Sequence, residues 1–397
     1  MAYTVLARRY RSTSFDTVVG QEPVARTLCN AIGTGRVAHA YLFTGTRGVG
    51  KTSMARIFAR ALNAPDTIEA CPRLADVEYP ELEVQQRMAE AIMRGDDLNV
   101  IEIDGASNNS VDNIRQLISN AGLSPTGNAH FKVYIIDEVH MLSPGAFNAL
   151  LKIMEEPPEH VKFILCTTEP HKVPVTIQSR CQRFDFRNIA TPRIAAHLKD
   201  VLKNEKVKAE DQVIWQLARL ANGSMRDGLS LLDRLIATGQ NPLTGAVLEQ
   251  MLGLPAQELV VQLVDAMGQG DVAGSLKRTA DLLDRGIAQD QLVDVLIDRL
   301  RQLMLMQACG AESELVELAE DAKQAAAEQA RQFDVSALVY MIALCENLQR
   351  AGKLSSTPRA LLDATVVRLA LAEKMADVAA LLSGNGSVAR GAEKKKQ

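Results

Sequence analysis

Residues 45–52, with the sequence GTRGVGKT, match the pattern G-x-x-x-x-G-K-[ST] of a phosphate-binding loop. An apolar run over residues 40–44 comes directly before them, and a helical pattern that includes Met54, Ile57 and Phe58 comes directly after. The motif needs this context, because the backbone N–H groups of the loop and the N-terminus of the helix together surround a phosphate group. The stretch therefore predicts an α/β domain that binds a nucleotide.

Each residue type in this loop suits one part of a bound nucleoside triphosphate. Glycines let the backbone curl around the phosphates, Lys51 is expected to reach the β- and γ-phosphates, and the hydroxyl of Thr52 is expected to hold Mg²⁺. The expected cofactors are therefore ATP and Mg²⁺. The expected nucleotide-binding residues of the loop are Gly45, Gly48, Gly50, Lys51, Thr52 and Ser53.

A second motif is the apolar run VYIIDE over residues 133–138, which ends in two acids. Asp137 is expected to hold the Mg²⁺ shell together with Thr52, and Glu138 is expected to polarise the attacking water. A strand that ends in Asp-Glu is usually a solvated strand end, but its pairing with the phosphate-binding loop favours a site. Glu138 further favours hydrolysis over binding alone.

Short apolar runs and helical patterns alternate between residues 40 and 186, which predicts repeated βαβ units and a parallel sheet. The expected strands cover residues 40–44, 100–103, 132–136 and 162–167. From about residue 191 onward strand signals fade and helical patterns dominate.

The predicted fold class is an α/β P-loop domain with a parallel sheet, followed by all-helical lid and collar domains. The expected domains are 1–187 for the P-loop domain, 188–243 for the helical lid and 244–375 for the helical collar that serves oligomerisation. Residues 376–397 are expected to form a flexible tail, because Gly, Ser and Lys replace the apolar pattern there.

The composition limits the kind of protein. None of the apolar stretches in the 397 residues approaches the roughly 18 residues that a membrane span needs, so no contact with the membrane interior is expected. Six scattered cysteines without a CxxC pair exclude a disulfide scaffold, and the N-terminus lacks the apolar region of a signal peptide, so we expect a cytoplasmic location. The net charge of -4 means that contact with nucleic acid needs a local basic patch.

Several further stretches resemble one family. They are LARRYR at 6–11, DEVHMLS at 137–143, TTEP at 167–170, SRC at 179–181 and GSMRD at 223–227. With the two motifs above, they make the chain similar to the gamma/tau ATPase subunits of bacterial DNA polymerase III clamp loaders, within the AAA+ superfamily. The resemblance covers roughly residues 3–374. It implies a subunit that hydrolyses ATP to load a sliding clamp onto primed DNA, in a ring of about five subunits.

The resemblance also implies roles for three residues. Thr168 is similar to the family's sensor 1 residue, which lies in reach of the γ-phosphate. Arg180 is similar to the arginine finger that reaches the ATP of an adjacent subunit, and Arg226 to the sensor 2 residue of the lid. Taken alone, each has a simpler explanation: Thr168 as a β-former, Arg180 as a surface charge, and Arg226 in the first turn of a helix capped by Ser224.

The family binds primed DNA through its phosphate backbone, which places Arg115 and Lys152 near the DNA. Both can equally be exposed helix charges. Two other functions stay open: a different AAA+ motor such as a branch-migration helicase, and a structural subunit that binds nucleotide without turnover.

The sequence departs from the family at its zinc module. Relatives commonly carry four cysteines after the P-loop helix, whereas this chain has only Cys71 and no histidine between residues 63 and 99. One possible ligand cannot form a four-coordinate structural site, so we expect no zinc. The apolar spacing of Leu82, Met88 and Ile92 predicts a helix in its place.

Overall fold

The computed structural model describes residues 3–372 apart from 254, 256, 312, 314, 317, 319, 353 and 354. The described residues group into two units, one made of 3–206 with 217–234 and the other of 207–216 with the residues from 235 onward. The lid expected over 188–243 contributes residues to both units, and the three-domain division stays a prediction. The tail expected over 376–397 lies outside the described residues.

The first unit contains a five-stranded parallel sheet with the order β2-β3-β4-β1-β5, which confirms the predicted α/β class. Since all strands run in one direction, the loops after β1, β3 and β4 leave the same edge of the sheet. The strands are β1 (Ala40–Thr44), β2 (Val100–Asp104), β3 (Lys132–Asp137), β4 (Val161–Thr167) and β5 (Gln182–Asp185).

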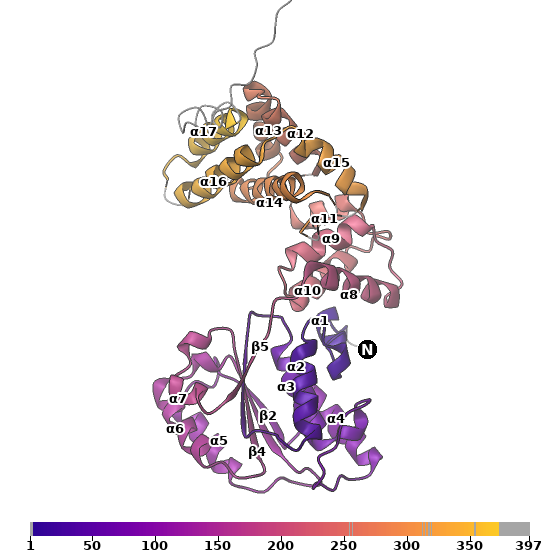
Figure 1. The fold of residues 1–397 in the computed structure, drawn as a ribbon, viewed down its shortest axis with the longest axis vertical. Helices are drawn as coiled ribbons and strands as arrows, with labels where there is room; N and C mark the ends of the chain where they lie inside the picture. The colour runs from indigo at the N-terminus through magenta and orange to yellow at the C-terminus, as the bar shows by residue number, and fades with distance from the viewer. Residues whose placement is uncertain are drawn as a thin grey trace, which may run out of the picture. The chain divides into compact units, whose positions relative to one another are not determined.

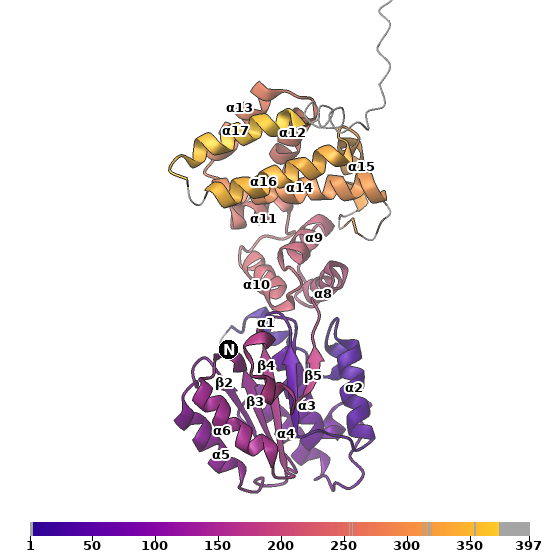
Figure 2. The ribbon, with the colours of Figure 1, turned by 60° about the vertical axis from the view of Figure 1, so that its left-hand side comes forward.

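Helices cover both faces of this sheet (Figures 1 and 2). On one face lie α2 (Glu22–Gly33), α3 (Lys51–Asn63) and α4 (Leu82–Arg94), and on the other lie α5 (Val111–Ala121), α6 (Pro144–Glu155) and α7 (Val175–Gln178). Alternate residues of each strand enter the two cores: Tyr41 and Phe43 of β1 face α3, whereas Leu42 belongs to the core beneath α5 and α6. The helix predicted in place of the zinc module is α4.

The fifth strand, β5, is missing from the sequence-based expectation. Three of its four residues are polar and exposed, and only Phe184 is buried. A strand at the edge of a sheet needs few apolar residues, so its sequence carries no period-2 pattern to detect.

Three more helices of the first unit lie beyond the sheet: α1 (Leu6–Arg9), α8 (Thr191–Asn204) and most of α10 (Met225–Ile236). The N-terminal segment is bonded to both of the others. Tyr3 donates a hydrogen bond to Asp233 of α10, and Arg9 forms an ion pair with Glu205 at the end of α8. The short 3₁₀ helices are η1 (Phe15–Thr17), η2 (Pro65–Thr67), η3 (Val139–Met141) and η4 (Pro170–Lys172).

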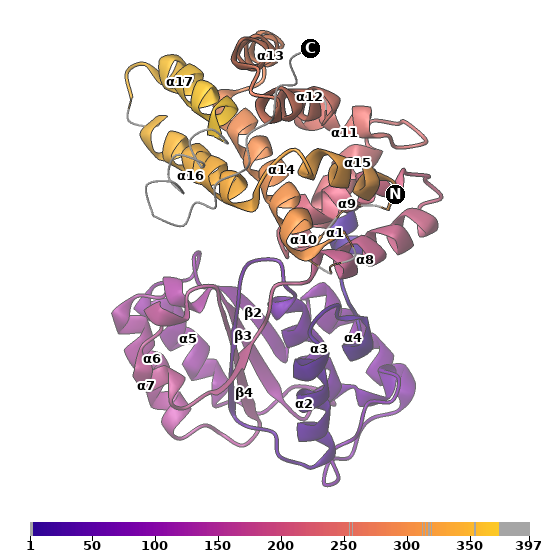
Figure 3. The same cartoon turned by 45° about the horizontal axis from the view of Figure 1, so that its top comes forward.

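The second unit is helical, and its central helix α14 packs against α15 and α16 (Figure 3). Leu292, Leu296, Leu300 and Leu303 of α14 are all buried, as their spacing predicts. No helix among the described residues has the length and apolar character needed to cross a bilayer. The remaining helices are α9 (Asp211–Leu220), which both units share, α11 (Gly245–Leu252), α12 (Gln257–Gly268), α13 (Val272–Asp284), α14 (Gln289–Cys309), α15 (Glu320–Ala330), α16 (Val335–Gly352) and α17 (Pro358–Ala370).

Candidate nucleotide-binding site

The glycine-rich loop joins β1 to α3, as its sequence predicts, and its backbone is shaped by two glycines. Gly50 caps α3 with φ +101°, and Gly48 has φ +79°, both in the left-handed region that L side chains avoid. A Cβ at Gly48 would also collide with Oγ of Ser224. The loop therefore needs glycine at 48 for conformation and for space. The N–H of Gly45 donates to the carbonyl oxygen of Thr167 at 3.3 Å, so the N–H groups of residues 46–50 are those that can surround an anion.

Lys51 is the first residue of α3 and is only 6% exposed. Its Nζ donates hydrogen bonds to the carbonyl oxygens of Gly45 at 2.7 Å and Thr46 at 2.8 Å, so the ammonium group is held over the loop. Burial lowers the pKa of Lys51, and the charges of Asp137 and Glu138 act against this shift. A cation taken out of water in this way favours the approach of an anion.

The two expected magnesium ligands lie together. The Oγ1 of Thr52 donates a hydrogen bond of 2.7 Å to Oδ2 of Asp137, which ends β3. Mg²⁺ in nucleotide sites is usually bound through one or two protein oxygens together with phosphate oxygens and water. A hydroxyl and a carboxylate next to the phosphate-binding loop therefore fit Mg²⁺ bound with a nucleotide.

Glu138 has an unusual backbone for its residue type. Its φ of 45° and ψ of 46° are left-handed, a conformation that costs a non-glycine residue on the order of 1–3 kcal/mol. Its Oε2 accepts a hydrogen bond of 3.0 Å from Oγ1 of Thr168, directly after β4. The strained turn sets the backbone of Glu138 at the carboxyl edge of the sheet, and this bond restrains its carboxylate.

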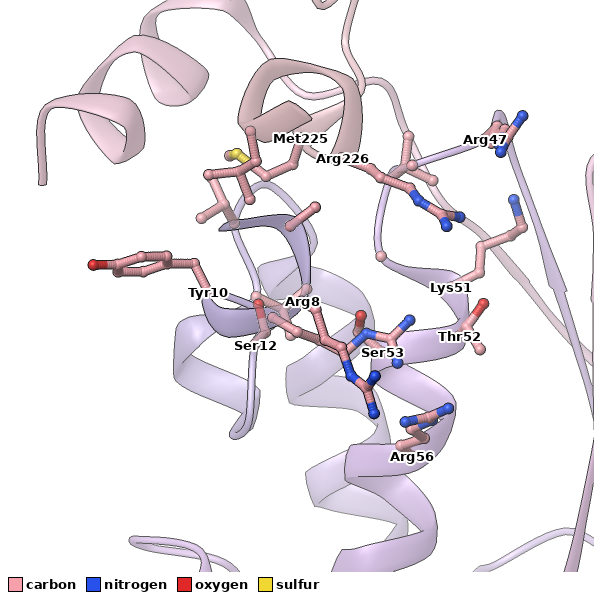
Figure 4. A pocket seen from close by; sticks show the side chains of 18 of the residues that line it. Arg8, Tyr10, Ser12, Arg47, Lys51, Thr52, Ser53, Arg56, Met225 and Arg226 are labelled. Carbon is pink, nitrogen blue, oxygen red and sulfur yellow. The ribbon is translucent and has the colours of Figure 1, made fainter. Parts of the chain in front are cut away.

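A cavity of about 450 Å³ within the first unit brings the loop and the acids together. Figure 4 shows Lys51, Thr52 and Arg226 among the side chains that line it. Of the predicted residues, Gly48, Gly50, Lys51, Thr52, Ser53, Asp137, Glu138 and Arg226 line it. Seven of its lining residues are arginine or lysine and two are acidic, so it favours anions. Apolar residues also contribute to its wall and could receive a base: Val18, Val19, Ile189, Met225 and Leu229.

Five arginines of this cavity, Arg8, Arg11, Arg47, Arg56 and Arg94, were not predicted as site residues. Burial lowers the pKa of Arg11, and the nearby Arg56 charge lowers it further. Arg56 also forms an ion pair with Glu102 at 2.6 Å. The arginine-rich stretch at residues 6–11 was a signal in the sequence, but no motif places it beside a loop some forty residues away.

Family comparisons match three consecutive parts of the chain. Residues 20–190 match the family described as "DNA polymerase III, delta subunit" and residues 193–241 the "DNA polymerase III clamp loader subunit, ATPase lid domain". Residues 243–384 match "DNA polymerase III subunits gamma and tau domain III".

Individual relatives agree with these families. The DNA polymerase III subunit gamma of Buchnera aphidicola (subsp. Acyrthosiphon pisum) is 37% identical over 303 residues, which are 76% of this chain and 80% of that protein. The chain belongs to the DNA polymerase III gamma/tau family. The tau/gamma subunit of Haemophilus influenzae is 43% identical over 307 residues, which are 77% of this chain. The chain spans 43% of the length of that gamma/tau subunit.

Among solved structures, the RuvB Holliday junction branch migration motor of Thermotoga maritima aligns with a TM-score of 0.45 at 17% identity, over 65% of this gamma/tau chain and 79% of that one.

Arg226 of this gamma/tau chain lies at the start of α10, and in Figure 4 its guanidinium group points toward the P-loop. The alternative explanation from the sequence is also present, since Oγ of Ser224 accepts a hydrogen bond of 3.2 Å from the N–H of Asp227. Capping by Ser224 orients the helix, and it leaves the Arg226 side chain free to line the cavity.

Arg180 does not line this cavity. It follows α7 and donates hydrogen bonds to Oε1 of Glu155 at 2.7 Å and to the carbonyl oxygen of Thr176 at 2.8 Å. Its side chain is 34% exposed, so part of the side chain is accessible to a partner.

The two residues expected at DNA lie on neighbouring helices of one sheet face. Arg115 of α5 is 71% exposed and lies 3.5 Å from Asp112, and Lys152 of α6 is exposed as well. Neither position distinguishes a DNA contact from an exposed helix charge.

No group of three or more His, Cys, Asp or Glu residues in the described part of the chain could hold a metal ion. Cys71 itself is half-buried, and burial raises the pKa of its thiol to about 12, which disfavours the thiolate form that binds zinc. The absence of zinc stays a prediction.

Proposed function

We propose that the chain binds ATP with Mg²⁺ in the cavity above the P-loop and hydrolyses it, as the ATPase subunit of a DNA polymerase III clamp loader. The observation that carries this proposal is that two hydrogen-bonded pairs lie near the buried Lys51. One pair is Thr52 with Asp137, and the other is Glu138 with Thr168. Hydrolysis needs a metal site, a base and a cation at one place, and these residues supply all three types.

The binding step follows from charge and shape. The N–H groups of residues 46–50 would hold the phosphates, since the N–H of Gly45 donates to the carbonyl oxygen of Thr167. Lys51 would exchange its bonds to Gly45 and Thr46 for phosphate oxygens. Thr52 and Asp137 would hold Mg²⁺, which supplies charge neutralisation of the phosphates. The adenine base would contact the apolar wall near Val18 and Ile189.

In the hydrolysis step, Glu138 would accept a proton from the attacking water. A positioned general base contributes about 10²- to 10⁴-fold to a rate, provided that its carboxylate is held in reach of the water. The bond from Thr168 restricts Glu138 in this way, which supports the role of sensor 1 for Thr168.

Two arginines would sense and stabilise the phosphates. Arg226 enters the cavity of its own chain and suits the sensor 2 role. Arg180 lies outside that cavity, which supports a role at the ATP of an adjacent subunit. In exchange for Glu155, its planar guanidinium group would bind γ-phosphate oxygens there.

At the level of the assembly, we propose a ring of about five clamp-loader subunits in the cytoplasm, which opens a sliding clamp and releases it on primed DNA. Arg115 and Lys152 would contact DNA phosphates. Phosphate contacts need no base recognition, so a local basic stripe suffices in a chain with a net charge of -4.

The test is ATP hydrolysis by the reconstituted assembly, measured with the sliding clamp alone, with primed DNA alone and with both. We expect the highest rate with both present. A rate stimulated by DNA alone and indifferent to the clamp would favour a branch-migration motor instead. Binding of ATP without any hydrolysis would favour a structural subunit.

A further inference from the structure

His140 lies beside the proposed general base and has no role in the function proposed so far. It belongs to the 3₁₀ turn η3, and its side chain is only 6% exposed. The Nδ1 atom lies 3.0 Å from Oγ1 of Thr167 and 3.4 Å from Oε2 of Glu138. The imidazole ring thus contacts the same carboxylate oxygen that accepts the bond from Thr168.

The opposite side of the ring contacts a different segment. The Nε2 atom lies 3.3 Å from Oε1 of Glu169, whose carboxylate also forms an ion pair with Lys172 at 2.9 Å. The N–H of Glu169 donates a hydrogen bond of 3.0 Å to Oγ1 of Thr167. His140, Thr167 and Glu169 therefore each contact the other two. Either ring nitrogen can carry the proton, and each faces an acceptor.

We propose that His140 is a positioning residue that holds the Glu138 carboxylate in place for attack on ATP. The inference rests on the proposed function, since it assigns a role in that same hydrolysis. The left-handed turn fixes only the backbone of Glu138, and 32% of its side chain is exposed. Two lateral contacts, from Thr168 and from His140, restrict the remaining rotation of the carboxylate.

A role limited to packing is the competing explanation for a buried histidine. Substitutions that replace one ring nitrogen at a time distinguish a packing role from a positioning role. In place of His140, asparagine puts an amide nitrogen near the position of Nδ1, and glutamine puts one near the position of Nε2. His140→Asn therefore keeps a donor for Glu138 and Thr167, and His140→Gln keeps a donor for Glu169. His140→Phe retains the ring shape without either donor.

The experiment measures ATP affinity and single-turnover hydrolysis of the full chain in its reconstituted assembly. We expect His140→Phe to bind ATP within about twofold of wild type and to hydrolyse it roughly 10²-fold more slowly, because misplacing a catalytic group by about 1 Å costs this much. His140→Asn should recover most of the rate, and His140→Gln should resemble His140→Phe. His171→Phe is the matched control. His171 is 73% exposed, and its Nε2 lies 3.6 Å from Oε2 of Glu169. It shares this partner with His140 but not the contact with Glu138, so we expect His171→Phe to leave the rate unchanged.

The comparison of the asparagine and glutamine variants decides the question even where the phenylalanine variant does not fold. A fast glutamine variant and a slow asparagine variant would overturn the inference in favour of a contact to Glu169 alone. Equal rates in all variants, or equal losses accompanied by weaker ATP binding and a lower Tm, would also overturn it. A wild-type chain that binds ATP without hydrolysing it would overturn the proposed function itself, and the inference with it.

Discussion

Glu138 combines a strained, left-handed backbone with side-chain contacts to Thr168 and His140. The sequence was enough to select Glu138 as a candidate site residue, because Asp-Glu at the end of an apolar run is a local pattern in a chain that also has a P-loop motif. Its left-handed backbone and its bond to Thr168 were not predictable, since they depend on the turn at η3 and on a residue thirty positions away. Arg8 and Arg11 of the cavity were missed for the same reason, since residues 6–11 reach the P-loop only through the folded chain. Arg47 lies within the P-loop motif, but at a position where the motif accepts any residue type.

Lys51 gives the first test among single residues. Lys51→Ala removes the buried ammonium group, and we expect ATP affinity to fall about tenfold to hundredfold, which is the usual value of a hydrogen bond to a charged group. Isothermal titration with ATP and Mg²⁺ measures it. Arg87→Ala, an exposed cation on α4 outside the cavity, serves as the control. Unchanged affinity in Lys51→Ala would mean that phosphates do not bind at this loop.

Among the secondary-structure elements, the strands with strong apolar runs were predicted to within a residue or two, and so was α4 from its helical spacing. The edge strand β5 was missed because it buries only Phe184. Local periodicity thus identifies elements that bury a whole face, whereas an element that depends on one neighbour leaves little pattern in the sequence.

The loop between β1 and α3 gives a test at this level. Gly48→Ala places a side chain where φ is +79° and where Ser224 already fills the space, so we expect a loss of stability above the 1–2 kcal/mol of backbone strain and weaker ATP binding. Gly35→Ala is the matched control. Gly35 has φ +67° with nothing within 4 Å of a Cβ, so it should show the strain alone and keep wild-type affinity. Thermal unfolding with and without ATP measures both. Equal effects of the two variants would contradict the packing of Gly48 against Ser224.

For the molecule as a whole, the change from an α/β to a helical part was predictable from the loss of strand signals after residue 191. The division into two compact units was not predictable from the sequence. Residues 207–216 belong to the unit of the later helices, whereas residues 217–234 belong to the unit that contains the sheet. Which helix packs against which depends on the match of side chains between surfaces, and a single sequence does not display that match.

Arg180 tests whether hydrolysis requires a neighbouring subunit. Arg180→Ala should bind ATP normally and lose about 10³- to 10⁵-fold in hydrolysis within the assembly, the usual contribution of an arginine finger. Mixing it with Lys51→Ala should restore part of the rate, because the second chain supplies an intact finger and the first an intact pocket. An isolated monomer as active as the assembly would show instead that Arg180 is a surface charge.

Metal content provides a second test of the whole chain. Because Cys71 has no companion cysteine or histidine between residues 63 and 99, elemental analysis of the purified chain should find no stoichiometric zinc. A zinc chelator should leave its Tm unchanged. One zinc ion per chain would refute this prediction and would require ligands from other parts of the sequence.

We propose that this cavity binds ATP and that Glu138 activates the water that hydrolyses it. Glu138→Gln preserves the size of the side chain and leaves the Thr52–Asp137 pair intact, so it separates binding from chemistry. The measurement is single-turnover hydrolysis together with ATP affinity, for wild type and Glu138→Gln in the same assembly. We expect equal affinity within about twofold and hydrolysis slower by about 10²- to 10⁴-fold in the variant. Hydrolysis by Glu138→Gln at the wild-type rate would contradict the claim.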